Sequence, residues 1–390
     1  MIEFPIHLTH QHRVIFTESV FGLENETLTG VFALAREHRR QRTRVLVFLD
    51  SGLAETNPGL LAQVSAWFAM RTEQLDLRSE PIIIQGGESC KNDFDLVQRL
   101  WAEINDAALD RHSYVLVVGG GATLDLVGLA AATAHRGIRL IRLPTTTLSQ
   151  GDGGVGVKNG VNYFGKKNWV GTFAVPFAVV NDLKFLDALP PIARRAGYIE
   201  AIKVSLIRDG AFFEEMERSA EAMRNFEPKI LRRVIERSAE LHVRHIATGG
   251  DPFELGSARP LDFGHWVAHK LEQITGFAVS HGEAVAIGIA VDLIYANLSG
   301  MLEEADCVRI LKLIDELGFS LWHNALLQTV PDDPSQLAVL RGLEEFREHL
   351  GGDLCITLVI GIGKAIEVRE MDEKLVRKAI EQLHALAIQG

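Results

Sequence analysis

The feature that most constrains the fold is an alternation, in the first half of the chain, of short runs rich in β-branched residues with stretches of helical character. The β-branched runs span residues 44–50, 81–85, 113–121, 138–144 and 177–182. Helices are expected between them, for example over 57–71 and over 93–108, where Asn92 and Asp93 offer a capping side chain. This rhythm predicts an α/β domain built on a parallel sheet.

The second half of the chain has a different pattern. From about Pro190 the β-branched runs become rare and amphipathic helical patterns take over, as in 230–246 and 307–318. The sequence Leu189-Pro190-Pro191 interrupts any continuous element, because proline lacks the backbone donor and restricts the residue before it. We therefore expect an α/β domain over 1–188 and a mostly α-helical domain over 189–390.

Composition excludes several classes of function. The 390 residues carry a formal net charge of -11, which would repel nucleic acid or an anionic membrane. Three scattered cysteines are too few for a disulfide framework, and neither a signal peptide nor an apolar run of membrane-spanning length is visible. We expect a cytoplasmic protein with no nucleic-acid or membrane partner.

Glycines follow two of the predicted strands and suggest a site for a dinucleotide. Gly119, Gly120 and Gly121 end one strand and open a helix, where backbone amides can approach a pyrophosphate. The run is not a G-x-G-x-x-G fingerprint, and a plain tight loop is the alternative. Another loop contains Gly86-Gly87-Glu88 with Lys91, and Asp50 ends an earlier strand, where a carboxylate can bind a ribose. In a parallel sheet these loops meet at the carboxyl ends of the strands.

A long polar, glycine-rich segment, residues 144–171, follows the strand at 138–144. Lys158, Lys167 and Asn168 are suitable phosphate contacts, and Asp152 supplies a carboxylate near them. A flexible hairpin with solvated lysines is the alternative. Arg136, in the turn before the preceding strand, either adds an anion contact or is an ordinary surface residue.

Three histidines and one glutamate in the second half point to a divalent metal. His265 and His269 are four residues apart and share a helix face, while His281 opens a further apolar segment. Glu200, with Lys203 one turn later, offers a carboxylate for a Glu/His/His site, although a local ion pair is the alternative. Spacing alone leaves His269 as a ligand, a substrate contact or a core histidine.

The order of these motifs resembles the sugar phosphate cyclase superfamily, typified by 3-dehydroquinate synthase, over nearly the whole chain. The matching motifs are GGE-x-x-K, GGG with a downstream Asp, PTT-x-x-x-Q-x-D, a lysine six residues later, a KN pair, E-x-x-K, GH-x-x-x-H and HGEAV. The strings GVGVKNGVN and DPFELGSARPLDFGHW are most similar to a synthase-like branch encoded in ebo-type gene clusters.

The resemblance implies a role for each matching position. It implies a divalent metal, usually zinc, on Glu200, His265 and His281, with His269 at the phosphate end of the substrate. It implies a Rossmann-like domain that binds NAD through Asp50, Glu88, Lys91, Gly120, Gly121, Asp125, Thr145 and Thr146, with Lys167 beside them. It places Asp152, Lys158, Asn168 and Lys203 in the active site. Arg136 matches an arginine that reaches the phosphate across a dimer interface, which implies a homodimer.

The implied reaction is redox-neutral. NAD⁺ takes a hydride from the substrate, phosphate leaves, the hydride returns, and an aldol step closes the carbocycle, so NAD is not consumed. The implied substrate is a phosphorylated seven-carbon sugar, with dehydroquinate formation as the first candidate and a heptulose 7-phosphate substrate as the alternative. A metal-dependent polyol dehydrogenase is a further alternative, although the phosphate-binding cations argue against it.

Several positions depart from the dehydroquinate-forming members. Ala258 and Asp262 replace an arginine and an asparagine, Arg259 is displaced by one residue, and Arg244 stands where a lysine is usual. Further along, Arg347-Glu348 replaces a DKK string, and Leu124 replaces a glycine in the glycine turn. Because several of these positions bind the anionic groups of the substrate, the departures leave the identity of the substrate open.

Overall fold

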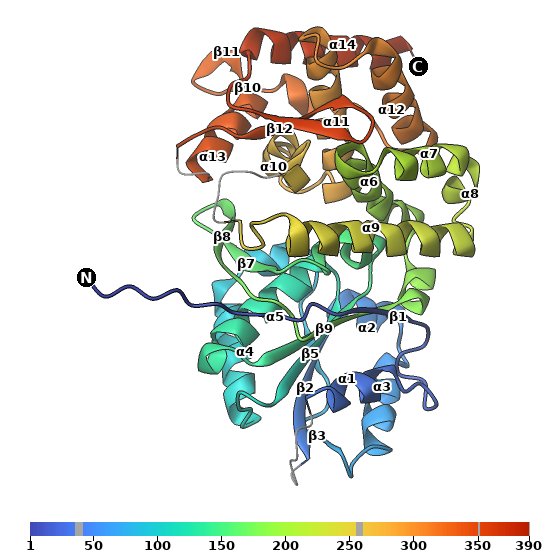
Figure 1. Cartoon of the computed structure of the whole chain (residues 1–390), viewed down its shortest axis with the longest axis vertical. Coiled ribbons are helices and arrows are strands. Elements are labelled where there is room, and N and C mark those ends of the chain that lie inside the picture. The colour runs from blue at the N-terminus through green and yellow to red at the C-terminus, as the bar shows by residue number, and fades with distance from the viewer. Residues whose placement is uncertain (36–41, 255–259, 350–351, 390) are drawn as a thin grey trace. The chain divides into compact units, whose positions relative to one another are not determined.

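The structure is a computed structural model of the chain and describes residues 1–35, 42–254, 260–349 and 352–389. It divides into two compact units, Met1–Leu189 and Pro190–Gly390 (Figure 1). The expected boundary lies one residue earlier. None of the helices in the described ranges combines the length and apolar character needed to cross a membrane.

Unit 1 is built on a seven-stranded sheet in which every strand pair is parallel. Its strands are β1 (Val14–Thr17), β2 (Thr43–Asp50), β3 (Leu75–Leu77), β4 (Ile82–Ile84), β5 (Tyr114–Gly119), β6 (Arg139–Pro144) and β9 (Ala178–Asp182). The strand order is β1-β9-β6-β5-β2-β3, and β4 also pairs with β2. The predicted parallel α/β sheet is confirmed, and all five expected strands are present.

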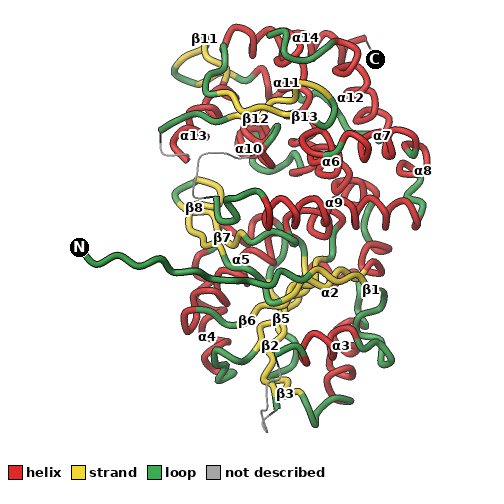
Figure 2. Tube along the Cα trace, in the orientation of Figure 1, coloured by secondary structure: helices red, strands yellow, loops and turns green. Residues whose placement is uncertain are grey.

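Helices cover both faces of this sheet (Figures 1 and 2). Both faces need cover because successive side chains on a buried strand point to opposite faces. Val45, Val47 and Leu49 pack with residues of α1 (Thr27–Ala33) and α3 (Leu60–Ala69). Leu46 and Phe48 pack with residues of α4 (Phe94–Asp106) and α5 (Gly121–Thr133) on the other face. The site residues at the strand ends therefore rest on two hydrophobic cores.

The helix expected over 57–71 is shorter than predicted. Asp50 caps a separate short helix, α2 (Ser51–Thr56), by accepting hydrogen bonds from the backbone of Gly52 and Leu53, and α3 starts only at Leu60. The helix expected over 93–108 is confirmed as α4, and the Asp93 side chain accepts hydrogen bonds from its first turn. Boundaries of this kind depend on local capping, which propensity alone does not place.

The polar segment after β6 contains regular structure that the sequence did not predict. A π-helical turn over Ser149–Gly153 leads into an antiparallel hairpin of β7 (Lys158–Tyr163) and β8 (Lys166–Phe173). The hairpin alternative is therefore correct for the backbone. Four residues of β7, from Asn159 to Asn162, are buried, so this hairpin is packed against the unit.

Unit 2 is mostly helical, as predicted. Its helices are α6 (Pro191–Arg208), α7 (Gly210–Arg218), α8 (Ala220–Arg224), α9 (Pro228–Thr248), α10 (His265–Ile274), α11 (His281–Leu298), α12 (Glu304–Glu316), α13 (Arg341–His349) and α14 (Glu373–Gln389). Helix α11 contacts α6, α10, α12 and α14. Its side chains are apolar on nearly all sides and buried from Ala284 to Ala296, as expected for a central helix.

Two small hairpins in unit 2 were not expected. They are β10 (Thr329–Val330) with β11 (Asp333–Leu337), and β12 (Ile356–Gly361) with β13 (Lys364–Val368). Only β12 carries a marked apolar run, and it contacts α11. The two residues of β10 and the mixed polarity of β11 and β13 give little periodicity to detect.

Candidate active site

Three ligand-type side chains of unit 2 meet at one point. Glu200 lies in the middle of α6, while His265 and His281 are the first residues of α10 and α11. Oε1 of Glu200 is 3.8 Å from Nε2 of His265 and 3.7 Å from Nε2 of His281. The three donor atoms lie within 4.8 Å of one another. The structure therefore brings together the three residues proposed from the sequence as metal ligands.

Close packing of α10 on α11 produces this meeting. Gly264 has a φ of +77° and caps α10, and a Cβ added at Gly288 of α11 would lie 2.0 Å from the Gly264 carbonyl oxygen. The buried carboxylate of Asp292 accepts hydrogen bonds from the Gly264 amide (3.1 Å) and from Nε1 of Trp266 (2.8 Å). Burial raises the pKa of Asp292 to about 7. These contacts fix the start of α10, and with it His265.

The charges around Glu200 suit a metal ligand. Burial, reinforced by the positive charge of Lys203, lowers the pKa of His265 to about 3, so its imidazole is neutral near pH 7. Nδ1 of His265 is 3.0 Å from the carbonyl oxygen of Phe263, which leaves Nε2 directed to Glu200. Oε2 of Glu200 pairs with Nζ of Lys203. One carboxylate thus serves the ion pair through Oε2 and faces the histidines through Oε1.

A second group of ligand-type residues adjoins the first. His269, Glu272 and His281 also have donor atoms within 4.8 Å of one another. Glu272 is 2% exposed, and its Oε2 is 3.4 Å from Nδ1 of His281. Our sequence reasoning missed Glu272, although its spacing from His265 and His269 places all three on one helix face.

In unit 1 the carboxyl ends of the strands carry the predicted cofactor residues. Gly120 is the N-cap of α5, and a Cβ added at Gly121 would meet no atom within 4 Å. The amide of Thr145 donates to the carbonyl oxygen of Gly119 at 3.0 Å, and the hydroxyl of Thr146 lies 2.8 Å from that of Ser149. The glycine turn therefore leaves open space before the first amides of a 13-residue helix.

Lys91 is the centre of a charged network in unit 1. Its side chain is 3% exposed, and its Nζ donates to Oδ2 of Asp125 at 2.9 Å and to Oδ1 of Asn168 at 2.5 Å. Although burial opposes the charged form, Asp125 and Glu88 raise the pKa of Lys91 above its ordinary value. Nζ of Lys167 is 3.7 Å from Oε1 of Glu88. The network brings together five residues assigned to cofactor and active site.

Asp50 has a structural role that the sequence did not indicate. Besides capping α2, its carboxylate accepts a hydrogen bond from the hydroxyl of Thr123 at 2.5 Å. A Cβ added at Gly86 would lie 2.3 Å from the Asp50 carboxylate, so only glycine fits there without rearrangement. Asp50, at the end of β2, thus contacts the start of α5 and the loop at Gly86. Its contact with a ribose stays a prediction.

Arg142 is the second residue that our sequence reasoning missed. It is fully buried in β6, and its guanidinium donates to the carbonyl oxygens of Gly154, Gly156 and Lys158 and to Oδ1 of Asn159. These four bonds hold the backbone from the end of the π-helical turn to the start of β7, where Lys158 lies exposed. An arginine in the interior of an otherwise apolar strand was the available signal.

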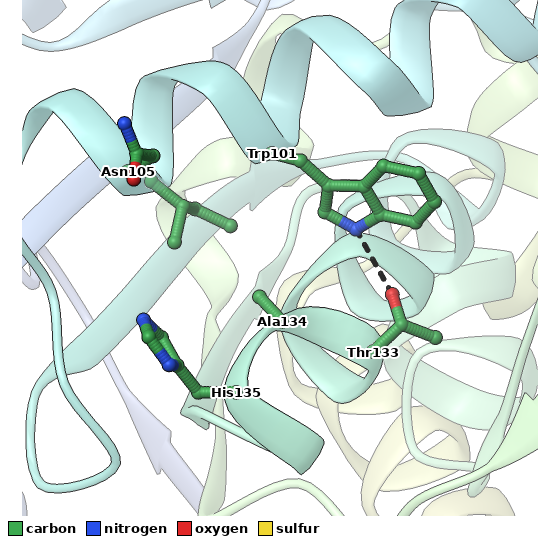
Figure 3. A pocket seen from close by; sticks show the side chains of 6 residues that line it. Trp101, Asn105, Thr133, Ala134 and His135 are labelled. Atoms are coloured by element: carbon green, nitrogen blue, oxygen red, sulfur yellow. Dashed lines mark hydrogen bonds between the residues drawn. The ribbon is translucent and has the colours of Figure 1, made fainter.

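Arg136 lies apart from the residues above. It is exposed, has a φ of +61°, and follows the C-terminal end of α5. A 13-residue helix is about 20 Å long, so Arg136 is distant from Gly121 at the other end. A pocket of about 330 Å³ adjoins this turn, lined by Trp101, Ile104, Asn105, Thr133, Ala134 and His135. In Figure 3, Trp101 donates a hydrogen bond to the hydroxyl of Thr133, and His135 faces the pocket.

The positions that depart from the dehydroquinate-forming pattern lie in different settings. Asp262 is partly buried in a 3-10 turn before α10, and its charge acts to raise the pKa of His265. Arg244 pairs with Glu240 on α9 at 2.6 Å and is 61% exposed. Leu124 is a fully buried core residue. Ala258 and Arg259 lie outside the described residues.

The chain matches one protein family in two consecutive blocks. Residues 81–196 match the family described as 3-dehydroquinate synthase N-terminal, and residues 197–337 match 3-dehydroquinate synthase C-terminal. The chain belongs to the 3-dehydroquinate synthase family. The predicted place among the sugar phosphate cyclases and the predicted two-part fold are confirmed.

Relatives in this family carry more than one activity. The chain is 31% identical to a 2-epi-5-epi-valiolone synthase of Streptomyces glaucescens, over 97% of this chain and 92% of the relative. It is 33% identical to a 3-dehydroquinate synthase of Pyrobaculum islandicum, over 77% and 86%. The structure of a 2-epi-5-epi-valiolone synthase of Streptomyces hygroscopicus, solved with NAD⁺ and Zn²⁺, superposes with a TM-score of 0.85 at 25% identity, over 98% of this chain and 99% of that one.

Proposed function

We propose that the chain is an NAD- and metal-dependent cyclase that eliminates phosphate from a phosphorylated seven-carbon sugar and closes its carbon skeleton by an intramolecular aldol step. The observation that carries the proposal is the meeting of Oε1 of Glu200 with Nε2 of His265 and of His281 in a member of this family. A solved relative that contains both NAD⁺ and Zn²⁺ supports it.

The three donors fit a catalytic metal site. Ligands about 2.0–2.1 Å from a tetrahedral zinc ion lie roughly 3.3 Å apart, and the separations of 3.7 and 3.8 Å need to shorten only slightly. Two imidazoles and a carboxylate form a three-ligand set that leaves a position for substrate. We assign the metal to Glu200, His265 and His281, and the ion is most simply zinc.

The glycine turn of unit 1 fits the pyrophosphate of NAD. Open space at Gly121 lets an anion approach the first amides of α5, and the helix dipole favours negative charge there. We assign the remaining cofactor contacts to the strand-end residues around the turn, namely Asp50, Glu88, Lys91, Gly120, Asp125, Thr145, Thr146 and Lys167.

The chain's own residues bind and orient the substrate in this proposal. When bound, NAD⁺ would supply a reversible hydride acceptor and the metal a Lewis acid for developing oxyanions. Lys203 pairs with Oε2 of Glu200, which leaves Oε1 directed to the histidines. In unit 2, His269 is assigned to the phosphate end of the substrate, where an imidazole donor favours the departing anion, and in unit 1 Lys158 offers a cation for an anionic substrate. Asp152 and Asn168 complete the polar contacts.

A heptulose 7-phosphate is the substrate that we favour. Asp262, three residues before His265, is partly buried, and its negative charge would repel the carboxylate of a heptulosonate. The match to a valiolone synthase over 97% of the chain supports this choice. The second candidate is a heptulosonate 7-phosphate, which the 33% identity to a 3-dehydroquinate synthase supports.

A competition between the two substrates tests the choice. Metal-loaded protein with NAD⁺ is given a heptulose 7-phosphate or a heptulosonate 7-phosphate, and phosphate release and product mass are measured. We expect kcat/KM for the heptulose to be at least about tenfold higher, because a repulsive contact between two like charges costs about 1.4 kcal/mol or more. Asp262→Asn removes the charge with little change in size and should reduce the difference in kcat/KM between the two substrates. A preference for the heptulosonate that Asp262→Asn leaves unchanged would contradict this choice.

We further propose that the active form is a cytoplasmic homodimer. Arg136 lies about 20 Å along α5 from Gly121, so it is placed to serve a phosphate in another copy of the chain. The buried free thiols of Cys90, Cys307 and Cys355 are compatible with a reducing compartment.

A further inference from the structure

Glu272 occupies a position behind the proposed metal ligands. It lies on α10 three residues after His269 and is almost completely buried. Its Oε2 is 3.4 Å from Nδ1 of His281, while Nε2 of the same ring is 3.7 Å from Oε1 of Glu200. The imidazole of His281 is therefore held between two carboxylates, one at each ring nitrogen.

The contact with Glu272 favours one tautomer of His281. A carboxylate oxygen accepts hydrogen bonds, so a proton on Nδ1 satisfies this contact and leaves the lone pair on Nε2, the nitrogen that faces Glu200. His265 has the same arrangement, except that its Nδ1 donates to the backbone carbonyl of Phe263. One histidine is thus oriented by the backbone and the other by a side chain that can be substituted.

We propose that Glu272 is a positioning residue that fixes the tautomer and ring orientation of His281 and thereby sets the affinity of the metal site. The inference rests on the proposed ligands Glu200, His265 and His281. A carboxylate that accepts from the distal nitrogen of a ligating histidine raises the basicity of the ring, and its loss weakens metal binding by about 10–100-fold. Glu272 itself is not a ligand in this proposal.

A different use of Glu272 makes a different prediction. Because His269, Glu272 and His281 have donor atoms within 4.8 Å of one another, they are also spaced to hold a second ion. The positioning role predicts one ion per chain, whereas a second site predicts two. The number of metal ions bound per chain therefore distinguishes the positioning role from a second metal site.

The test compares Glu272→Ala and Glu272→Gln with the wild type. Zinc affinity is measured by competition with a chromogenic chelator, and ligand geometry by the visible spectrum of the Co²⁺-loaded protein. We expect Glu272→Ala to bind one ion about 10–100-fold more weakly, with an altered Co²⁺ spectrum. Glu272→Gln should be intermediate, because its amide oxygen still accepts from Nδ1 but carries no charge. Since it is nearly isosteric, it carries the test if the alanine variant does not fold.

The control is Glu345→Gln. Glu345 also places a carboxylate against α10, at 2.5 Å from Nζ of Lys270, but its side chain is 38% exposed. The Glu345→Gln variant should have the same zinc affinity as the wild type. Wild-type affinity and spectrum in both Glu272 variants would overturn the inference, as would two ions in the wild type and one in Glu272→Ala. If the Glu200→Gln variant bound zinc as tightly as the wild type, the proposed ligand set itself would be overturned.

Discussion

Replacing Glu200 with glutamine is expected to remove bound metal and to lower the rate of phosphate release by at least about 10³-fold. The change keeps the size of the side chain but removes the charge of the only carboxylate in the proposed ligand set. It also leaves Lys203, which is 2% exposed, without its ionic partner. Metal content by elemental analysis and phosphate release under saturating NAD⁺ measure the effect.

A control must separate loss of metal from loss of stability, because breaking a buried ion pair costs about 3–5 kcal/mol. Asp209→Asn provides it. Asp209 caps α7 in the same unit and pairs with Arg237 of α9 at 2.5 Å, with its side chain 15% exposed. Asp209→Asn should lower the midpoint of unfolding and leave metal content unchanged. Full metal content and activity in Glu200→Gln would show that another residue supplies the carboxylate.

Replacing Arg142 with methionine is expected to destabilise unit 1 by at least about 3 kcal/mol, because four acceptors lose their donor and three of these hydrogen bonds are buried. In a domain of this size that loss lowers the thermal midpoint by on the order of 10 °C. The backbone around Lys158 is no longer held, so KM for the sugar phosphate should also rise. Calorimetry and initial rates measure the two effects.

Arg139→Met is the matched control for Arg142→Met. Arg139 lies on the same strand but is only partly buried, and it contacts the Tyr114 hydroxyl at 3.3 Å. Arg139→Met should lower the free energy of unfolding by about 1 kcal/mol and leave KM for the sugar phosphate unchanged. Equal destabilisation by the two variants would contradict the role given to Arg142.

The sequence predicted most of unit 1, because its strands are long apolar runs whose two faces are both buried. The same reasoning missed β1 and β3, which have only four and three residues. Strand β1 depends on a tertiary contact, in which the Asp182 carboxylate accepts from the backbone amides of Ser19 and Val20. Contacts between distant segments leave no local periodicity to detect.

The metal ligands illustrate what spacing can and cannot provide. Spacing paired His265 with His269, whereas the structure groups His265 with Glu200 and His281, as the resemblance implied. The decisive contact is the close approach of Gly264 to Gly288, two residues on different helices. Glu272 and Arg142 were missed because their roles depend on partners distant in the sequence. Arg142 nevertheless interrupts an apolar strand, and Glu272 extends the helix face of His265 and His269.

In the proposed reaction NAD serves as a hydride store and is returned in every cycle. The most direct test gives the metal-loaded protein an excess of heptulose 7-phosphate with much less NAD⁺ than substrate, and follows phosphate together with the absorbance of reduced nicotinamide. The proposal predicts that phosphate release continues far beyond the amount of NAD⁺ present, with no net gain of NADH. Accumulation of NADH in proportion to turnover, or release that stops at one phosphate per NAD⁺, would contradict the cyclase and favour a dehydrogenase.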